Sequence, residues 1–280
     1  MDFKNLRRVY PWAIALGAVL SGTIVQAKIV TYSFADKTRN SALIVVGKVT
    51  KLNENSVTLS VQRTLKGKAP SAEIEIPWNK QGNIEWAPVK YKLGDNVFVF
   101  ANETNGKLQP MGLGAQGAEP VNDDAATQYE SSVKKIQKYD AAQSPSEKAK
   151  IVAEMLQGSP VDQRTALVDI LYLDTKRDRV PSASLVPHVL RLAKGKDRAT
   201  AVPAVQVLGR IGDKAEVPEL IELLDSPDGH VAQTASRVLR DLTQNKSDVS
   251  PQETPEKRRE AKAKWREWWK QNKDKVKLRK

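Results

Sequence analysis

The chain has 280 residues, 40% of them hydrophobic and 28% charged, which is typical of a soluble protein long enough for two modest domains. It contains no cysteine, which excludes disulfide bonds, a cysteine-linked lipid anchor, thiolate catalysis and cysteine-ligated zinc. The formal net charge of +12 is concentrated at one end, because residues 256–280 hold twelve Lys or Arg and four Asp or Glu, whereas residues 28–255 carry only +2.

Residues 1–27 have the three parts of a secretory signal. Three basic residues precede an apolar run over residues 11–25, and Val25-Gln26-Ala27 has the small-x-small pattern of a cleavage site. The apolar run is shorter than the roughly 20 residues that a membrane-spanning helix needs. We therefore expect cleavage after Ala27, rather than an uncleaved anchor, and a periplasmic or secreted bacterial protein.

Residues 42–111 show the patterns of short β-strands. Residues 55–65 alternate between apolar and polar side chains, and the apolar run 42–46 is typical of a central strand. Asn53-Glu54-Asn55 predicts a turn between these two strands. Three further strands are expected, around Ile74–Ile76, around Val97–Phe100, and at Lys107–Gln109 after the hairpin dipeptide Asn105-Gly106. Five short antiparallel strands predict a small β barrel or sandwich.

Three stretches of this region also resemble a known domain. They are "ALIVVGKVTKL", "RTLKGKAP" and "YKLGDNVFVF", and they resemble an OB-like β domain of exported bacterial proteins that include relatives of metalloprotease inhibitors. The resemblance implies an OB-like barrel over residues 28–113 that acts as a binding module. Protease inhibition fits poorly, since those inhibitors depend on disulfides that this chain lacks.

A glycine-rich segment follows the strands. Gly112, Gly114 and Gly117 match the dinucleotide fingerprint G-x-G-x-x-G, which works only between a strand and a helix of a parallel unit. Pro110 and Pro120 flank the segment, and the strands before it are predicted to be antiparallel. We interpret residues 114–122 as a flexible linker.

Residues 123–255 have the periodicity of short helices. Helices are expected at 125–139, 145–156 and 161–173, separated by Gly, Pro and Asp. Two segments that begin at Leu185 and Glu216 then repeat one pattern with an offset of 31 residues. The matched pairs are Pro187 and Pro218 in a first helical turn, Asp197 and Asp228 as helix caps, and the alanines Ala201 and Ala232, and Ala204 and Ala235, as close-packing positions.

This repeat resembles the HEAT-like repeat, with residues 145–173 as a degenerate earlier member. The resemblance implies an α-solenoid, in which each helical pair buries its core against its neighbours. The predicted fold is therefore α+β in separate domains, a small antiparallel β barrel followed by a solenoid of helical pairs.

The last predicted helix combines aromatic and basic residues. Proline and glutamate open it at 255 and 256, and it continues to Asn272, with Trp265, Trp268 and Trp269 on one face. The cations Arg258, Arg259, Lys262, Arg266 and Lys270 mostly occupy the remaining surface. Such a helix can cap the last repeat, lie on an anionic membrane, or bind nucleic acid. We favour a capping helix at 256–272 and a basic tail at 273–280, because a repeat stack needs a terminal element with a polar exterior.

The capping interpretation has a second support. A terminal W-x-x-W-W helix resembles that of exported bacterial HEAT-like proteins. In this interpretation the three tryptophans close the stack, and the five cations on the outer face are the candidate ligand-binding groups.

Loop aromatics form another candidate site. Trp78, Trp86 and Tyr91 lie between predicted strands, beside lysines. They could form a stacking platform for sugar or single-stranded nucleic acid, or they could plug the open end of the barrel, which we favour because tryptophan is usually largely buried.

No catalytic residue, metal site or cofactor is predicted. His188 and His230, the only histidines, have no Asp or Glu placed to complete a metal set. We expect a non-catalytic protein-interaction scaffold with an unknown protein partner. The alternatives are a protein that binds an envelope polymer or anionic membrane surface, and a hydrolase with a dispersed site. Nucleic acid is a poor fit for an exported protein.

Overall fold

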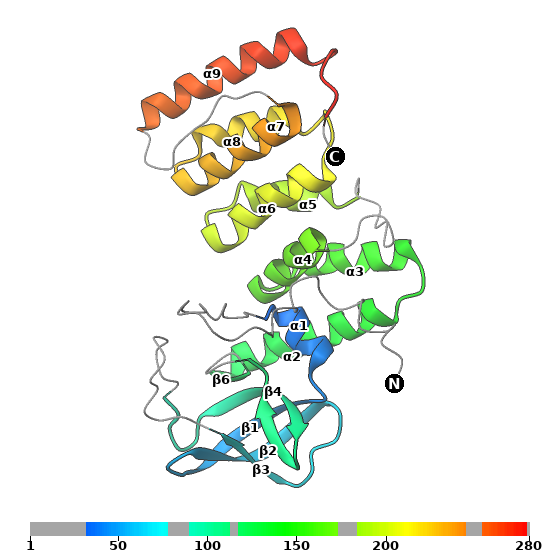
Figure 1. Cartoon of the computed structure of the whole chain (residues 1–280), viewed down its shortest axis with the longest axis vertical. Coiled ribbons are helices and arrows are strands. Elements are labelled where there is room, and N and C mark those ends of the chain that lie inside the picture. Colours follow the sequence, from blue (N-terminus) through cyan, green and yellow to red (C-terminus); the bar gives the residue numbers. More distant parts are fainter. Residues whose placement is uncertain (1–31, 78–89, 113–116, 173–183, 245–253, 279–280) are drawn as a thin grey trace, which may run out of the picture. The chain divides into compact units, whose positions relative to one another are not determined.

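The computed structural model describes residues 32–77, 90–112, 117–172, 184–244 and 254–278 (Figure 1). Residues 31–280 form one compact unit. The strands are β1 (Leu43–Leu52), β2 (Ser56–Lys66), β3 (Glu73–Pro77), β4 (Asn96–Thr104), β5 (Lys107–Pro110) and β6 (Ala118–Val121). The helices are α1 (Phe34–Asn40), α2 (Asp123–Ala141), α3 (Pro145–Gln157), α4 (Pro160–Tyr172), α5 (Val186–Ala193), α6 (Arg198–Ile211), α7 (Val217–Glu222), the 3-10 turn η4 (Leu223–Asp225), α8 (Gly229–Thr243) and α9 (Pro255–Asn272).

The strands form an antiparallel sheet in the order β3-β2-β1-β4-β5. All five strands expected from the sequence are confirmed, and so are both hairpins. Leu52 pairs with Val57 across the first turn. In the second turn Asn105 and Gly106 have positive φ angles of 52° and 72°, the backbone that makes Asn-Gly the preferred hairpin dipeptide.

The predicted closed barrel is wrong, because this sheet is open. In the described strands the outer strand β3 pairs only with β2, and β5 pairs only with β4. Closure needs a complete ladder of hydrogen bonds between the two outer strands. β3 and β5 come into contact, but β5 is only four residues long and ends at a proline, which cannot donate a ladder hydrogen bond.

The predicted linker 114–122 is also wrong in part, because residues 118–121 form β6. This strand pairs with the first half of β4, from Asn96 opposite Val121 to Val99 opposite Ala118. The proline at position 120 suggested a break, but proline is tolerated on an edge strand, where its missing N–H faces no neighbour. Residues 113–116 lie outside the described part.

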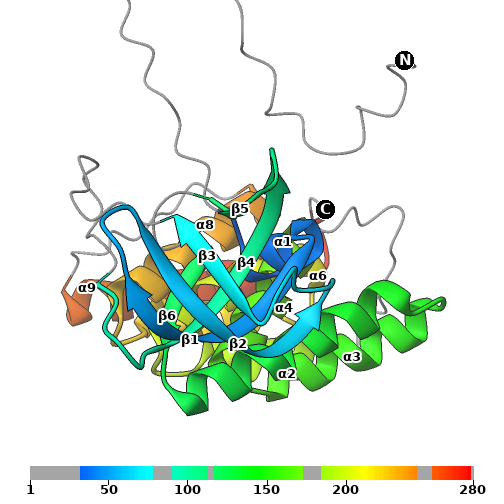
Figure 2. The same ribbon diagram turned by 90° about the horizontal axis from the view of Figure 1, so that it is seen from below.

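The two faces of the sheet have different apolar clusters. One cluster consists almost wholly of strand residues, including Val57, Leu59 and Ile76. The other, around Phe98 and Phe100, includes Val133 and Tyr129 of α2 and Phe34 of α1, so these helices lie against the sheet (Figure 2). Helix α2, which lies beyond the domain boundary predicted at 113, therefore packs directly on the sheet, whereas most of the buried helix residues belong to a separate cluster.

Helix α1, which the sequence analysis did not predict, contacts both the sheet and the helices. Ser33 and Asp36 form a capping box at its start. Lys37 makes a 2.9 Å ion pair with Glu119 of β6, and Phe34 packs edge-on against Phe100 of β4. Arg39 bridges α2 and α4, as described below.

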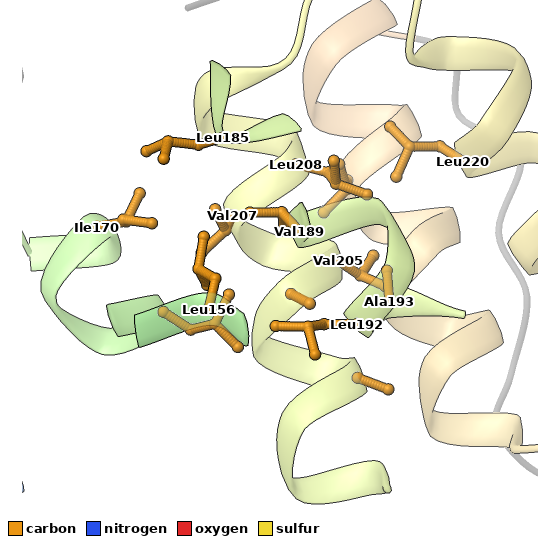
Figure 3. Close-up of a cluster of buried hydrophobic side chains, with 14 of the residues drawn as sticks. Leu156, Ile170, Leu185, Val189, Leu192, Ala193, Val205, Val207, Leu208 and Leu220 are labelled. Atoms are coloured by element: carbon orange, nitrogen blue, oxygen red, sulfur yellow. The ribbon is translucent and has the colours of Figure 1, made fainter. Parts of the chain in front are cut away.

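The remaining helices follow the predicted repeat. α5 and α6 correspond to α7 with η4 and α8, and both second helices begin at the expected aspartate caps. The matched alanines at 201, 204, 232 and 235 are fully buried. Figure 3 shows Leu156 and Ile170 meeting Val189 and Val207, so the cluster continues from the earlier pair α3–α4 into the repeat.

Neighbouring second helices are also tied by charge. Arg198, the first residue of α6, makes a 2.6 Å ion pair with the cap Asp228 of α8. Its hydrogen bond is the main cause that lowers the pKa of Asp228, and a hydrogen bond from Thr200 does the same for Asp197. The residue of α8 that is equivalent to Arg198 is Gly229, which has no side chain to form an ion pair. This arginine–aspartate link between second helices is therefore not repeated after α8.

Helix α9 packs on α7 and η4. Its start at Pro255 and its end at Asn272 confirm the expected helix. Trp265 is 1% exposed and Trp269 is also buried, whereas Trp268 is half-buried at the edge of the same cluster. Two of the three predicted capping side chains therefore lie fully in the core.

Candidate interaction surfaces

Of the three loop aromatics singled out in the sequence, only Tyr91 lies in the described part of the chain. Trp78 and Trp86 lie outside the described residues. Tyr91 is only 7% exposed, and its hydroxyl donates a 2.8 Å hydrogen bond to the carbonyl of Ala118. Burial, with the nearby Glu119 charge, raises the pKa of Tyr91 to about 12. Its ring is part of the apolar cluster of the strands, so Tyr91 offers no exposed face on which a ligand could stack.

Three of the five predicted outer-face cations of α9 are not free for a ligand. Arg258 is 7% exposed and buried. Lys262 makes a 3.2 Å ion pair with Asp225, and Arg266 makes a 2.6 Å ion pair with Glu222. The hydrogen bond from Arg266 is the main cause that holds the pKa of Glu222 below its ordinary value. These residues fasten α9 to α7 and η4, which helical periodicity alone could not reveal because their acidic partners lie on other elements.

The other two predicted cations remain on the surface. Arg259 is exposed and makes an ion pair with Glu256, one turn earlier, at 3.3 Å. Lys270 is exposed near the end of the helix. The chain beyond α9 is not a free arm, because Val276 and Leu278 pack against the helical core.

A surface that the sequence analysis missed runs across the second helices α4, α6 and α8, which contact one another in that order. We call it the second-helix face. The 31-residue offset places Val202 opposite Gln233 and Gln206 opposite Arg237. The burial pattern of α4 matches that of α6 with an offset of 38 residues, which adds Arg164 and Val168. The six residues that define the face are Arg164, Val168, Val202, Gln206, Gln233 and Arg237, and all are exposed or half-buried.

The chemistry of this face is unusual within the chain. α4, α6 and α8 contain arginine but no lysine, whereas α2, α3 and α9 each contain lysines. Arginine presents a rigid, planar set of donors, and it is enriched at protein interfaces where lysine is depleted. A repeat alignment could have exposed this surface if the outward positions had been compared as carefully as the buried ones.

Polar side chains also link the helices, and some of them are buried. Arg39 of α1 contacts Asp169 of α4 at 2.7 Å and Asp140 of α2 at 3.1 Å. Burial raises the pKa of Asp169 despite this pair. Asp162 of α4 accepts from Ser132 and pairs with Lys135, both of α2, at 2.6 Å each. Each of these contacts joins separate helices, so we assign both clusters to packing.

The candidate metal ligands and the two histidines are dispersed in the described part of the chain. In the described ranges no three His, Asp or Glu residues are grouped to hold a metal ion. His188 is half-buried and His230 is exposed, on helices of different repeats. A shallow hollow of about 480 Å³ lies beside the start of α2, lined by Asp95, Asn96 and Asp123 among others.

Among the helices described here, none combines the length and the apolar character that crossing a bilayer requires.

Comparison with known proteins adds no family. No family model, no curated protein and no solved structure matches this chain. The candidate surfaces therefore depend on the geometry and chemistry described above.

Proposed function

We propose that this chain is a non-catalytic, exported interaction scaffold of HEAT-like type, which binds a protein segment on the second-helix face. The observation that carries the proposal is that α4, α6 and α8 present outward side chains at equivalent positions, so that the three helices form one continuous surface. Consecutive second helices lie about 8–10 Å apart, so a chain extended across them advances about three residues from one helix to the next.

The six residues indicate what such a segment contains. Arg164 on α4 and Arg237 on α8 lie two helices apart and offer guanidinium groups to carboxylates. Val168, one turn after Arg164 on α4, and Val202, on the intervening helix α6, offer a small apolar area. Gln206 and Gln233 carry amides that can donate to and accept from a peptide backbone. The partner segment therefore has two acidic residues, separated by about six positions, on either side of an apolar residue.

Site-specific crosslinking tests this proposal. A photoreactive residue at Gln206 or Gln233, in the centre of the face, should capture a partner protein in cells that express the chain. The same residue at Glu154, exposed on α3, is the matched control and should capture nothing comparable. Charge reversal by Arg164→Glu together with Arg237→Glu should remove the capture at Gln206.

The contrary results are equally clear. Equal capture from Glu154 would show that the contact is not confined to the second-helix face. Capture at Gln206 that survives both charge reversals would refute the acidic partner. Both arginines are exposed, so the two charge reversals should leave the melting temperature unchanged. That measurement is the control that the variants are folded.

A further inference from the structure

The segment after α9 folds back on the helical part. The amide of Lys273 donates to the carbonyl of Trp269 at 2.8 Å, and the amide of Val276 donates to Asn272 at 3.0 Å. Val276 and Leu278 then pack against the helical core. Lys214, in the loop before α7, donates a 2.8 Å hydrogen bond from Nζ to the carbonyl of Lys273. The expected free tail 273–280 is therefore corrected for residues 273–278.

The hydrogen bond to Lys273 brings Lys214 beside a C-terminal segment that carries several further lysines. We call Lys214, together with Lys270, Lys273, Lys275 and Lys277, the lysine face. All five are exposed, and none makes an ion pair with another described residue. Asp213 and Asp274 are the acidic residues adjacent to them in the chain, so the set keeps an excess of positive charge.

We propose that the lysine face binds an anionic membrane surface. Lysine carries a compact, hydrated charge on a flexible stem, which suits a field of lipid headgroups better than one bidentate ligand. Lysine near such a surface contributes about 1 kcal/mol, and the attraction fades within a Debye length. Trp268, half-buried on the adjacent turn of α9, supplies the kind of ring that lies at a membrane interface.

This inference is independent of the proposed partner on the second-helix face, because the two surfaces share no residue. It also differs from binding by a flexible basic tail. In a flexible tail only the residues of 273–280 would matter. In the folded arrangement Lys214, about 60 positions earlier in the chain, contributes as much as a lysine of the tail.

The binding of residues 28–280 to lipid vesicles tests the inference. Vesicles that contain phosphatidylglycerol should bind the protein at low salt, and vesicles of phosphatidylcholine alone should not. Lys214→Ala and Lys273→Ala should each lower the partition coefficient about fivefold. Lys150→Ala, which removes an exposed lysine from α3, is the charge-matched control and should leave binding almost unchanged.

Each other outcome overturns the inference. Normal binding by Lys214→Ala with weak binding by Lys273→Ala would indicate a free tail. A loss in Lys150→Ala as large as that in Lys214→Ala would indicate only net charge. Binding to both kinds of vesicle, or to neither, would exclude an anionic membrane surface. Crosslinking on the second-helix face would be unaffected by any of these results.

Discussion

Replacing Trp265 by alanine should be the most damaging change in α9. Trp265 is 1% exposed, and its side chain is the largest of the fully buried ones in the described part of the chain. Its ring meets Trp268 edge-on at 5.4 Å between centroids. Truncating a buried tryptophan costs about 3–5 kcal/mol, because both the transfer of the ring and its packing contacts are lost. Trp268→Ala should cost less, about 1–2 kcal/mol, since that ring is only partly buried at the edge of the cluster.

A third variant separates the ring from its N–H group. The indole Nε1 of Trp265 is buried and has no hydrogen-bond partner in the described part of the chain. Leaving such a donor unpaired costs about 1–3 kcal/mol. Trp265→Phe removes this penalty while it keeps an aromatic ring, so its net loss should stay below about 2 kcal/mol.

Urea denaturation followed by far-UV circular dichroism is the appropriate assay, because it does not depend on the tryptophan fluorescence that the variants change. A loss of 1 kcal/mol corresponds to about 2–4 °C in melting temperature for a chain of this size. The order of stability should be wild type, Trp268→Ala, Trp265→Phe and Trp265→Ala, with the middle two close together. If Trp268→Ala costs as much as Trp265→Ala, the assignment of Trp265 to the core is refuted.

Three further predictions concern the helical contacts. Asp228→Ala should cost about 1 kcal/mol in unfolding free energy through loss of the cap of α8. Because the pKa of Asp228 lies below its ordinary value, this cost should be complete above about pH 4 and should shrink as the pH falls through the lower pKa of the folded state. Urea denaturation at several pH values measures the difference. Gly209→Ala should destabilise by about 1 kcal/mol in spite of the better helix propensity of alanine, because the new Cβ would lie 2.6 Å from Cγ1 of Val238; a gain in melting temperature would contradict the close approach of α6 and α8. Burial raises the pKa of Asp169, so this carboxylate takes up a proton at a higher pH in the folded state than in the unfolded state. The wild type should therefore gain stability relative to Asp169→Asn as the pH falls from neutral through that raised pKa. A stability difference that does not change with pH would contradict the raised pKa of Asp169.

The local elements were predictable because their causes lie within a few residues. Asn105-Gly106 predicts its hairpin since these residues adopt positive φ angles at low cost. The caps Asp197 and Asp228 predict where α6 and α8 begin, since an aspartate side chain accepts from the first free amides of a helix. Helix α1 and β6 escaped prediction, because α1 has only seven residues and β6 contains a proline.

The candidate sites were less predictable, because a side chain's availability depends on partners that are distant in sequence. Helical spacing correctly gathered the three tryptophans of α9 on one side, but it could not distinguish Trp268 from the two buried rings. It also left Lys262 and Arg266 as apparent ligand-binding cations, although Glu222 binds both of them.

Composition and short-range periodicity are enough to predict the alternating strands, the 31-residue repeat, the end of the chain where the positive charge is concentrated, and the absence of cysteine chemistry. Three features become visible only in the folded chain. The sheet stays open, α1 joins sheet and helices, and Lys214 lies beside the C-terminal turn. Each of these depends on long-range contacts, whose free energy comes from packing and ion pairs that no local pattern encodes.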